Sequence, residues 1–141
     1  MIKQTAEFTG EKVTIFTDGS YANGQELYAF VILLGDTEVA RGYGSCSLLQ
    51  GARNVSGELE AAYRACKFAY DNGASRIHLY ADYEGVKFFA LGMWTARTPV
   101  AIEYQKLIWT IPIPIDFEII RGHSGNKYNE LVDKLAKSAK I

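Results

Sequence analysis

The sequence is poor in the residue types that mark several specialised classes of protein. Its only cysteines, Cys46 and Cys66, lie far apart and lack the paired spacing of a zinc or redox motif, so we expect two reduced, buried thiols. No apolar run approaches the ~18 residues of a membrane span. Because residues 1–11 are mixed and polar, we also expect no signal peptide. The sequence therefore predicts a cytoplasmic protein without a membrane partner.

An excess of charge of either sign is also absent. Fifteen Lys and Arg residues stand against sixteen Asp and Glu residues, so the formal net charge of -1 provides no global basic field for nucleic acid. This net charge does not exclude a polyanionic substrate. If several acids gather around bound cations, the rest of the surface is more basic than the net charge suggests. The 141 residues, 48% of them hydrophobic, contain no repeat or linker. We therefore expect one domain, residues 1–141. We also expect a monomer.

The first regular element that the pattern predicts is a strand over residues 13–20. Its apolar side chains alternate up to Asp18, and a Gly-Ser turn pair follows. After a polar turn over residues 21–26, the apolar run 27–34 predicts a second, strongly buried strand. A Gly-Asp hairpin turn then leads into a third strand over residues 37–46.

A helix and a fourth strand come next and bring two more acids into the pattern. The helical spacing over residues 55–72 places Glu58 in the first turn of the helix. The strand over residues 76–81 ends at Asp82. Because a helical crossover joins this strand to the first one, the two should run parallel and bring Asp82 next to Asp18.

The remaining chain completes the pattern of alternating helices and strands. We expect a short helix over residues 84–91, a helix from Pro99 that ends before Pro112, a strand over 115–121, a flexible polar loop over 122–126 and a last helix over about 127–139. On that last helix Asp133 is embedded among apolar neighbours, which is costly unless it has a partner. Locally, pairing with the helix dipole explains Glu58 and, better still, Glu60, and His78 fits an ordinary sheet residue.

Four acids are thus expected at one place in the fold. Asp18 and Asp82 end strands, while Glu58 and Asp133 occupy helices that should pack on the same sheet. A cluster of like charges in a partly buried site has to be neutralised, and carboxylate oxygens select magnesium or manganese rather than zinc. Two such ions about 3.5–4 Å apart are a known solution for phosphodiester hydrolysis. The predicted reaction class is metal-assisted phosphoryl transfer to water.

The residues that carry this pattern resemble a known family. The segments 17–20, 54–62, 80–86 and 122–136 are similar, in this order, to the successive motifs of type 1 ribonuclease H, and the resemblance extends from about residue 13 to 139. Residues 82–85 and 94–99 look most like the bacterial branch, whose catalytic domain often follows a small hybrid-binding domain that we do not expect here. Any one of these motifs alone would be weak, but the ordered set is specific.

The resemblance implies an α/β, ribonuclease H-like fold: a five-stranded mixed sheet of order 3-2-1-4-5 with helices packed on it. It also implies an endoribonuclease that hydrolyses the RNA strand of RNA/DNA hybrids with two Mg2+ or Mn2+ ions per active site, leaving 5′-phosphate and 3′-hydroxyl ends. Asp18 would bridge both ions, Asp133 would complete the site that activates water, and Glu58 with Asp82 would hold the second ion. Glu58 would also accept a hydrogen bond from a ribose 2′-hydroxyl, and His123 would assist proton transfer or product departure.

The same resemblance implies contacts with the hybrid. Asn54 would lie at the minor groove, Thr98 and Arg97 near a phosphate of the DNA strand, and Gly19 and Ser20 would approach the RNA backbone through main-chain amides.

Two positions depart from the family pattern. Arg53 stands where many relatives have a small hydroxyl residue, and Glu84 where a neutral polar residue often touches the hybrid. With a net charge of -1, we expect weak, salt-sensitive binding of the hybrid.

Three alternatives stay open from the sequence. The chain could be a nucleic-acid binding module without catalysis, although the presence of all four acids argues against it. It could be a nuclease or integrase-like enzyme with the same sheet that acts on DNA, or the acids could be separate helix caps and turn residues, in which case no metal response is expected.

Overall fold

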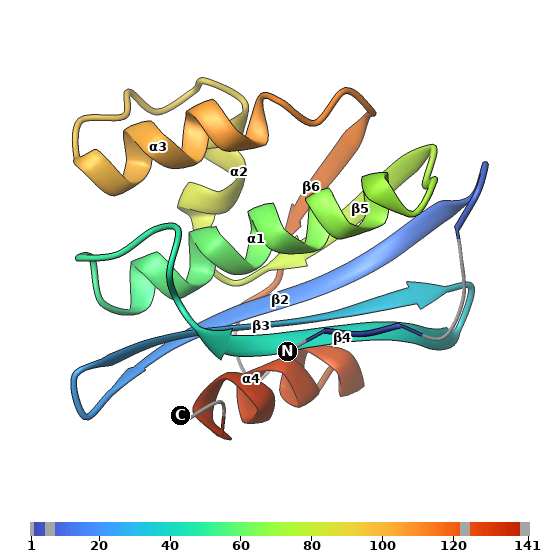
Figure 1. Ribbon diagram of the computed structural model, residues 1–141, viewed down its shortest axis with the longest axis horizontal. Helices are drawn as coiled ribbons and strands as arrows, with labels where there is room; N and C mark the ends of the chain where they lie inside the picture. Colours follow the sequence, from blue (N-terminus) through green and yellow to red (C-terminus); the bar gives the residue numbers. More distant parts are fainter. Residues whose placement is uncertain (1, 5–7, 122–124, 139–141) are drawn as a thin grey trace.

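The computed structural model describes residues 2–4, 8–121 and 125–138, and a mixed six-stranded sheet forms its centre (Figure 1). The strand order across the sheet is β1-β4-β3-β2-β5-β6. In chain order the elements are β1 Ile2–Gln4, β2 Lys12–Ala22, β3 Gln25–Leu34, β4 Thr37–Ser45, α1 Asn54–Asp71, β5 Arg76–Ala81, α2 Glu84–Ala90, α3 Pro99–Ile108, β6 Ile115–Ile119 and α4 Lys127–Ser138.

The five strands expected from the sequence are all present, in the expected order 3-2-1-4-5. The first three form an antiparallel meander, and β5 pairs in parallel with β2. The additional strand β1 lies at the edge and pairs with β4 through Ile2 and Gly42. Its three residues are too few for an alternating pattern to emerge from the polar segment around them.

The hairpin between β2 and β3 is longer than expected. The polar turn predicted over residues 21–26 is too long, because Ala22 pairs with Gln25 and only Asn23 and Gly24 form the turn. Their φ angles of 53° and 76° fit the two-residue Asn-Gly turn that follows the twist of a hairpin. The extra ladder carries Tyr21, whose side chain is exposed, beyond the level of Asp18.

Helices cover both faces of the sheet (Figure 1). On one face, α1 packs its buried alanines against β2 and β3 side chains that include Ile15 and Ile32. On the other face, Val132 of α4 packs against Phe16 and Val31. Because successive strand residues point to opposite faces, Asp18 lies on the face of Phe16 and therefore of α4. The candidate active-site acids therefore come from helices on both faces of the sheet and from the sheet itself.

The two cysteines have the environment that the sequence predicts. Cys46 and Cys66 are free and buried, and burial raises the pKa of both thiols above the ordinary range. Within the described part of the chain, no helix combines the length and the apolar character needed to cross a membrane.

Candidate active site

Asp18 marks the level at which strands β2 and β5 separate. The parallel ladder between them ends at the pair of Phe16 and Tyr80, two residues before Asp18 and Asp82 respectively. On the other side, Asp18 remains paired with Ala29 of β3, so it is not at the end of its strand as expected. The Asp18 side chain accepts a hydrogen bond of 2.8 Å from the backbone N–H of Gly19. Strand β3 therefore continues beside Asp18 on one side, while the pairing with β5 on the other side has already ended.

Two glycines bring Glu58 next to Asp18. A Cβ atom on Gly19 would overlap the backbone of Gly57 and Glu58, and one on Gly57 would overlap the carbonyl oxygen of Leu27. The first turn of α1 can therefore lie directly on strands β2 and β3 only because both positions lack a side chain. The approach buries Glu58, which is 6% exposed, beside Asp18.

Glu58 is a buried acid whose charge is poorly compensated. Its Oε1 atom has no hydrogen-bond partner among the residues that the structure describes. Burial raises the pKa of Glu58 well above its usual range, and the neighbouring charges of Asp18, Asp82 and Asp133 raise it further. An unpartnered buried oxygen costs free energy, so this position is built for a group other than the protein's own donors.

Asp18 and Asp133 complete the cluster from the sheet and from α4. Burial raises the pKa of Asp18 to about 6, the Gly19 N–H opposes this shift, and the charge of Asp133 adds to it. Asp133 is partly exposed and accepts a hydrogen bond of 3.0 Å from Lys137, one helical turn further along α4. The charges of Asp18, Asp82 and Asp133 all act on Glu58, so the four predicted acids lie near one another in the fold.

The donor set of this cluster fits a divalent cation. Carboxylate oxygens are the ligands that magnesium and manganese prefer, and a cation would relieve both the mutual repulsion and the unpartnered Glu58 oxygen. Among the described residues, no three His, Cys, Asp or Glu side chains are arranged as a ready-made metal centre. The arrangement is thus a cluster of repelling acids.

The predicted substrate contacts lie on several elements. Ser20 belongs to β2, Asn54 is the exposed first residue of α1, and Arg97 and Thr98 are exposed before α3. Thr98 also has a structural task, since its Oγ1 accepts a hydrogen bond of 3.2 Å from the Ala101 N–H and caps α3. The prediction for His123 falls on the segment 122–124, which lies outside the described residues.

Glu60 is an acid that the sequence interpretation assigned wrongly. It is completely buried and accepts hydrogen bonds of 2.9 to 3.1 Å from the backbone N–H groups of Ser47, Leu48 and Leu49. It also pairs with Arg64 at 2.6 Å. Its charge is therefore matched by loop amides and a guanidinium, and the helix dipole is not its main partner. The sequence contains no local signal for this, because the amides belong to a loop without periodicity.

Arg121 is a further residue at the site that the sequence did not single out. It follows β6 and pairs with Glu84 at 2.9 Å, at the start of α2. The charges of Glu84 and Asp82 both raise the pKa of Arg121. Glu84, which departs from the family pattern, therefore has a cation beside it.

Comparison with known proteins agrees with this geometry. The family model for RNase H matches residues 10–141. A protein named Ribonuclease H from Cyanothece sp. is 29% identical over 138 residues, which cover 88% of this chain and 86% of that protein. The crystal structure of RNase H1 from the archaeon Halobacterium salinarum superposes with a TM-score of 0.72 at 24% identity, covering 91% of this chain and 96% of that one.

LC11-RNase H1, solved in complex with an RNA/DNA hybrid, superposes with a TM-score of 0.70 at 19% identity and covers 90% of this chain and 98% of that chain. At such identities these two structures establish the fold, while the family model, which spans nearly the whole chain, establishes the family. The chain belongs to the ribonuclease H family of enzymes, with the motifs and the fold of a type 1 catalytic domain.

Proposed function

We propose that the chain is an endoribonuclease that hydrolyses the RNA strand of RNA/DNA hybrids with two Mg2+ or Mn2+ ions, leaving 5′-phosphate and 3′-hydroxyl ends. The observation that carries the proposal is the buried, unpartnered Oε1 of Glu58 within a cluster of four acids. The hybrid bound to LC11-RNase H1, a protein with the same fold, supports the choice of substrate.

Each of the four acids would bind one or both of the ions. Asp18 would be the shared ligand, Asp133 would complete the site nearer to the attacking water, and Glu58 with Asp82 would hold the other ion. When bound, such ions supply a hydroxide nucleophile at neutral pH and stabilise the leaving oxygen. The Gly19 N–H, 2.8 Å from Asp18 Oδ1, holds the shared carboxylate in one orientation for this purpose.

Glu58 would also select RNA over DNA. The 2′-hydroxyl group is the atom by which a protein can distinguish the two at a given position, and a carboxylate oxygen without another donor can accept its hydrogen bond. His123 would assist proton transfer or product departure. The hybrid would be held by Asn54 at the minor groove and by the other contacts predicted from the family: Gly19, Ser20, Arg97 and Thr98.

A panel of substrates tests the proposal. The chain is incubated with labelled RNA/DNA hybrid, double-stranded DNA and double-stranded RNA, each with magnesium, manganese or chelator. We expect cleavage of the RNA strand of the hybrid alone, dependent on the metal, with ends that a ligase requiring a 5′-phosphate accepts. Cleavage of the DNA duplex, or cleavage of the hybrid in the presence of chelator, would overturn the proposal.

A further inference from the structure

Arg121 and Glu84 form an ion pair next to one of the clustered acids. Nη2 of Arg121 lies 2.9 Å from Oε1 of Glu84, which is the first residue of α2. Glu84 follows Asp82 by only two residues in the sequence. The pair therefore adds one positive and one negative side chain to the edge of the acid cluster.

The end of the sheet places Arg121 at this position. The parallel ladder of β5 and β6 pairs Ala81 with Ile119, and one further hydrogen bond of 2.8 Å runs from the Ile120 N–H to the Ala81 carbonyl. Arg121 comes directly after this bond, and Asp82 comes directly after Ala81. The charge of Asp82 also reaches the guanidinium and contributes to the raised pKa of Arg121. The backbone thus holds Arg121 close to Asp82.

The stability of the fold does not explain the pair. The side chain of Arg121 is 72% exposed and that of Glu84 is 37% exposed. Ion pairs between exposed side chains contribute little to the free energy of folding. An unpaired acid at this edge would also repel a polyanion that approaches the cluster. The pair is therefore better explained by what binds at the acids than by what holds the chain together.

The guanidinium of Arg121 has room for a second partner. An arginine side chain carries five N–H donors in a planar fork. Within the part of the chain that the structure describes, Arg121 uses Nη2 for its bond to Glu84. The exposed remainder of the fork matches the oxygen atoms of a phosphate group. A guanidinium that one acid holds in place can thus receive a phosphate on its open side.

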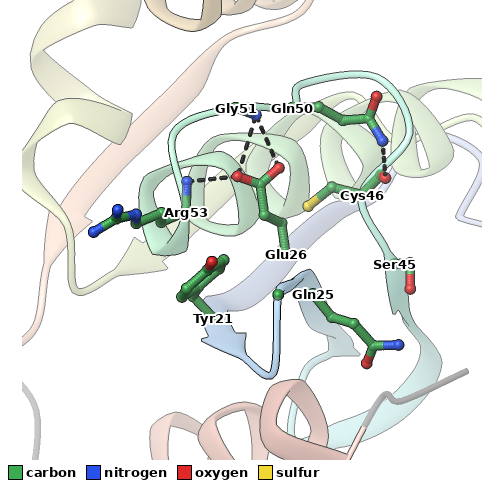
Figure 2. Close-up of a pocket in the computed structure, with 9 residues that line it drawn as sticks. Tyr21, Gln25, Glu26, Ser45, Cys46, Gln50, Gly51 and Arg53 are labelled. Atoms are coloured by element: carbon green, nitrogen blue, oxygen red, sulfur yellow. Dashed lines mark hydrogen bonds between the residues drawn. The ribbon is translucent and has the colours of Figure 1, made fainter.

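Arg53, another arginine near the acids, is held in a different way. It lines a hollow of about 440 Å³ between the β2–β3 hairpin and the loop that leads into α1 (Figure 2). Glu26 in that hollow accepts a hydrogen bond of 2.6 Å from the backbone N–H of Arg53. In the order of the strands the hollow lies on the β3 side of Asp18, whereas Arg121 lies on the β5–β6 side. Glu84 binds a guanidinium directly, so it can set the direction of that side chain.

We propose that Arg121 binds a phosphate of the nucleic-acid backbone at the β6 side of the acid cluster, and that Glu84 is the positioning residue that holds the guanidinium for this contact. The arginine also compensates the charge of Glu84, so that this acid does not repel the substrate. Glu84, which departs from the family pattern, then acts through Arg121 and does not itself touch the hybrid. The inference rests on the proposed function, because it takes the RNA/DNA hybrid as the occupant.

The test compares Arg121→Ala, Arg121→Lys and Glu84→Gln in hybrid cleavage. Arg121→Ala should raise KM about tenfold with kcat nearly unchanged, because the contact is made equally before and during the reaction. Arg121→Lys should raise KM less, since it keeps the charge and loses the planar fork. Glu84→Gln should leave KM at or below the wild-type value, because the amide oxygen still accepts the Nη2 hydrogen bond while one negative charge is removed.

A double variant separates the two effects of the arginine. The KM of Glu84→Gln/Arg121→Ala should lie between that of the unmodified protein and that of Arg121→Ala, because the phosphate contact is lost but no unpaired acid is left. Binding of labelled hybrid, measured by fluorescence anisotropy in chelator, gives a readout without cleavage. Arg121→Ala should lower the slope of log affinity against log salt by about one, as the loss of one phosphate contact does.

The pair of Arg76 and Asp116 offers a matched control. It joins the same two strands near their other end, at 2.8 Å, with side chains that are 49% and 46% exposed. Arg76→Ala removes the same charge from an equivalent pair, so it should keep the wild-type KM and salt slope. Thermal unfolding should show that Arg76→Ala and Arg121→Ala both melt close to the unmodified protein, because both pairs are exposed.

The outcomes distinguish this inference from the proposed function. If the unmodified chain does not cleave hybrid, the proposed function fails, and the binding measurement still decides the role of Arg121. If Arg121→Ala keeps the wild-type affinity and salt slope, the inference is overturned and the proposed function stands. An equal rise in KM for Arg76→Ala would show a general effect of net charge and would contradict the inference. A rise in KM for Glu84→Gln as large as that for Arg121→Ala would also contradict it, since the carboxylate would then be the contact.

Discussion

Gly19 and Gly57 pack backbone against backbone where helix α1 crosses strands β2 and β3. This contact places Glu58 beside Asp18, since each acid is next to one of the two glycines in the sequence. The distance between the two most buried acids of the site is therefore set by two residues that have no side chain.

The first prediction concerns this contact. Gly57→Ala should lower the free energy of unfolding by about 3 kcal/mol or more, because the new methyl group would overlap the carbonyl oxygen of Leu27, which belongs to a buried strand. Gly10→Ala is the matched control: it has open space around it, so only its positive φ opposes the change, at about 1–2 kcal/mol. Urea unfolding measures both, and equal costs would show that the close packing is not needed.

The second prediction concerns the raised pKa of Asp18, which is caused first by burial and then by the neighbouring Asp133. The pKa of Asp18 is about 6 in the folded chain, against 3.8 for an unperturbed aspartate, so the unfolded chain releases this proton first as the pH rises. The metal-free protein should therefore lose stability between about pH 4 and 6 and remain weakened above that range. Asp18→Asn should recover about 1–3 kcal/mol at pH 8, measured by urea unfolding in chelator.

A corollary of that prediction involves the metal. Magnesium should raise the melting temperature of the unmodified protein at pH 8 and have a much smaller effect on Asp18→Asn, because the variant lacks the proposed shared ligand. If Asp18→Asn is less stable than the unmodified protein in chelator at pH 8, the ionised Asp18 carboxylate does not destabilise the metal-free fold as described.

The third prediction contrasts two buried acids on the same helix. Glu60→Gln should cost about 3–5 kcal/mol, because three loop amides and Arg64 lose the negative charge that they share. Glu58→Gln should leave the stability of the metal-free protein unchanged or slightly raised, because its carboxylate is short of donors. Only Glu58→Gln should retain the fold while losing activity. Equal destabilisation by the two changes would contradict the different roles assigned to them.

The fourth prediction concerns the thiols. Cys46 and Cys66 are buried and burial raises the pKa of both, so neither should react with iodoacetamide at pH 8 on a time scale of minutes in the native protein. In urea both should be alkylated at once, as mass spectrometry would show. Rapid labelling of either cysteine in the folded protein would disprove the burial assigned to it.

Much of the fold could be predicted because its elements carry strong local patterns. The strand Arg76–Ala81 alternates cleanly and has the predicted bounds, and the crossover through α1 requires it to be parallel to β2. The proximity of Asp18 and Asp82 follows from the same rule, because the parallel ladder of β2 and β5 ends two residues before both acids. Glu58 and Asp133 could be added because helices had to cover the sheet.

The features that the sequence does not predict depend on contacts between distant segments. The polar pattern puts Glu26 in a turn, although the Asn23-Gly24 pair is a hairpin signal that extends both strands. Its bonds to Gly51 and Arg53, like those of Glu60 to the loop after β4, join residues far apart in the chain and leave no periodicity. These hydrogen-bond partners can be identified only from the three-dimensional position of the loop.

We propose that the four clustered acids form one metal-dependent site for cleaving the RNA of a hybrid. The most direct measurement is a single time course of hybrid cleavage in magnesium by the unmodified protein and by Asp18→Asn, Glu58→Gln, Asp82→Asn and Asp133→Asn, each first shown to be folded by circular dichroism. We predict that the unmodified protein cleaves the RNA strand and that every variant is slower by roughly 100-fold or more. Near-normal cleavage by folded Asp18→Asn would show that Asp18 is not the shared metal ligand.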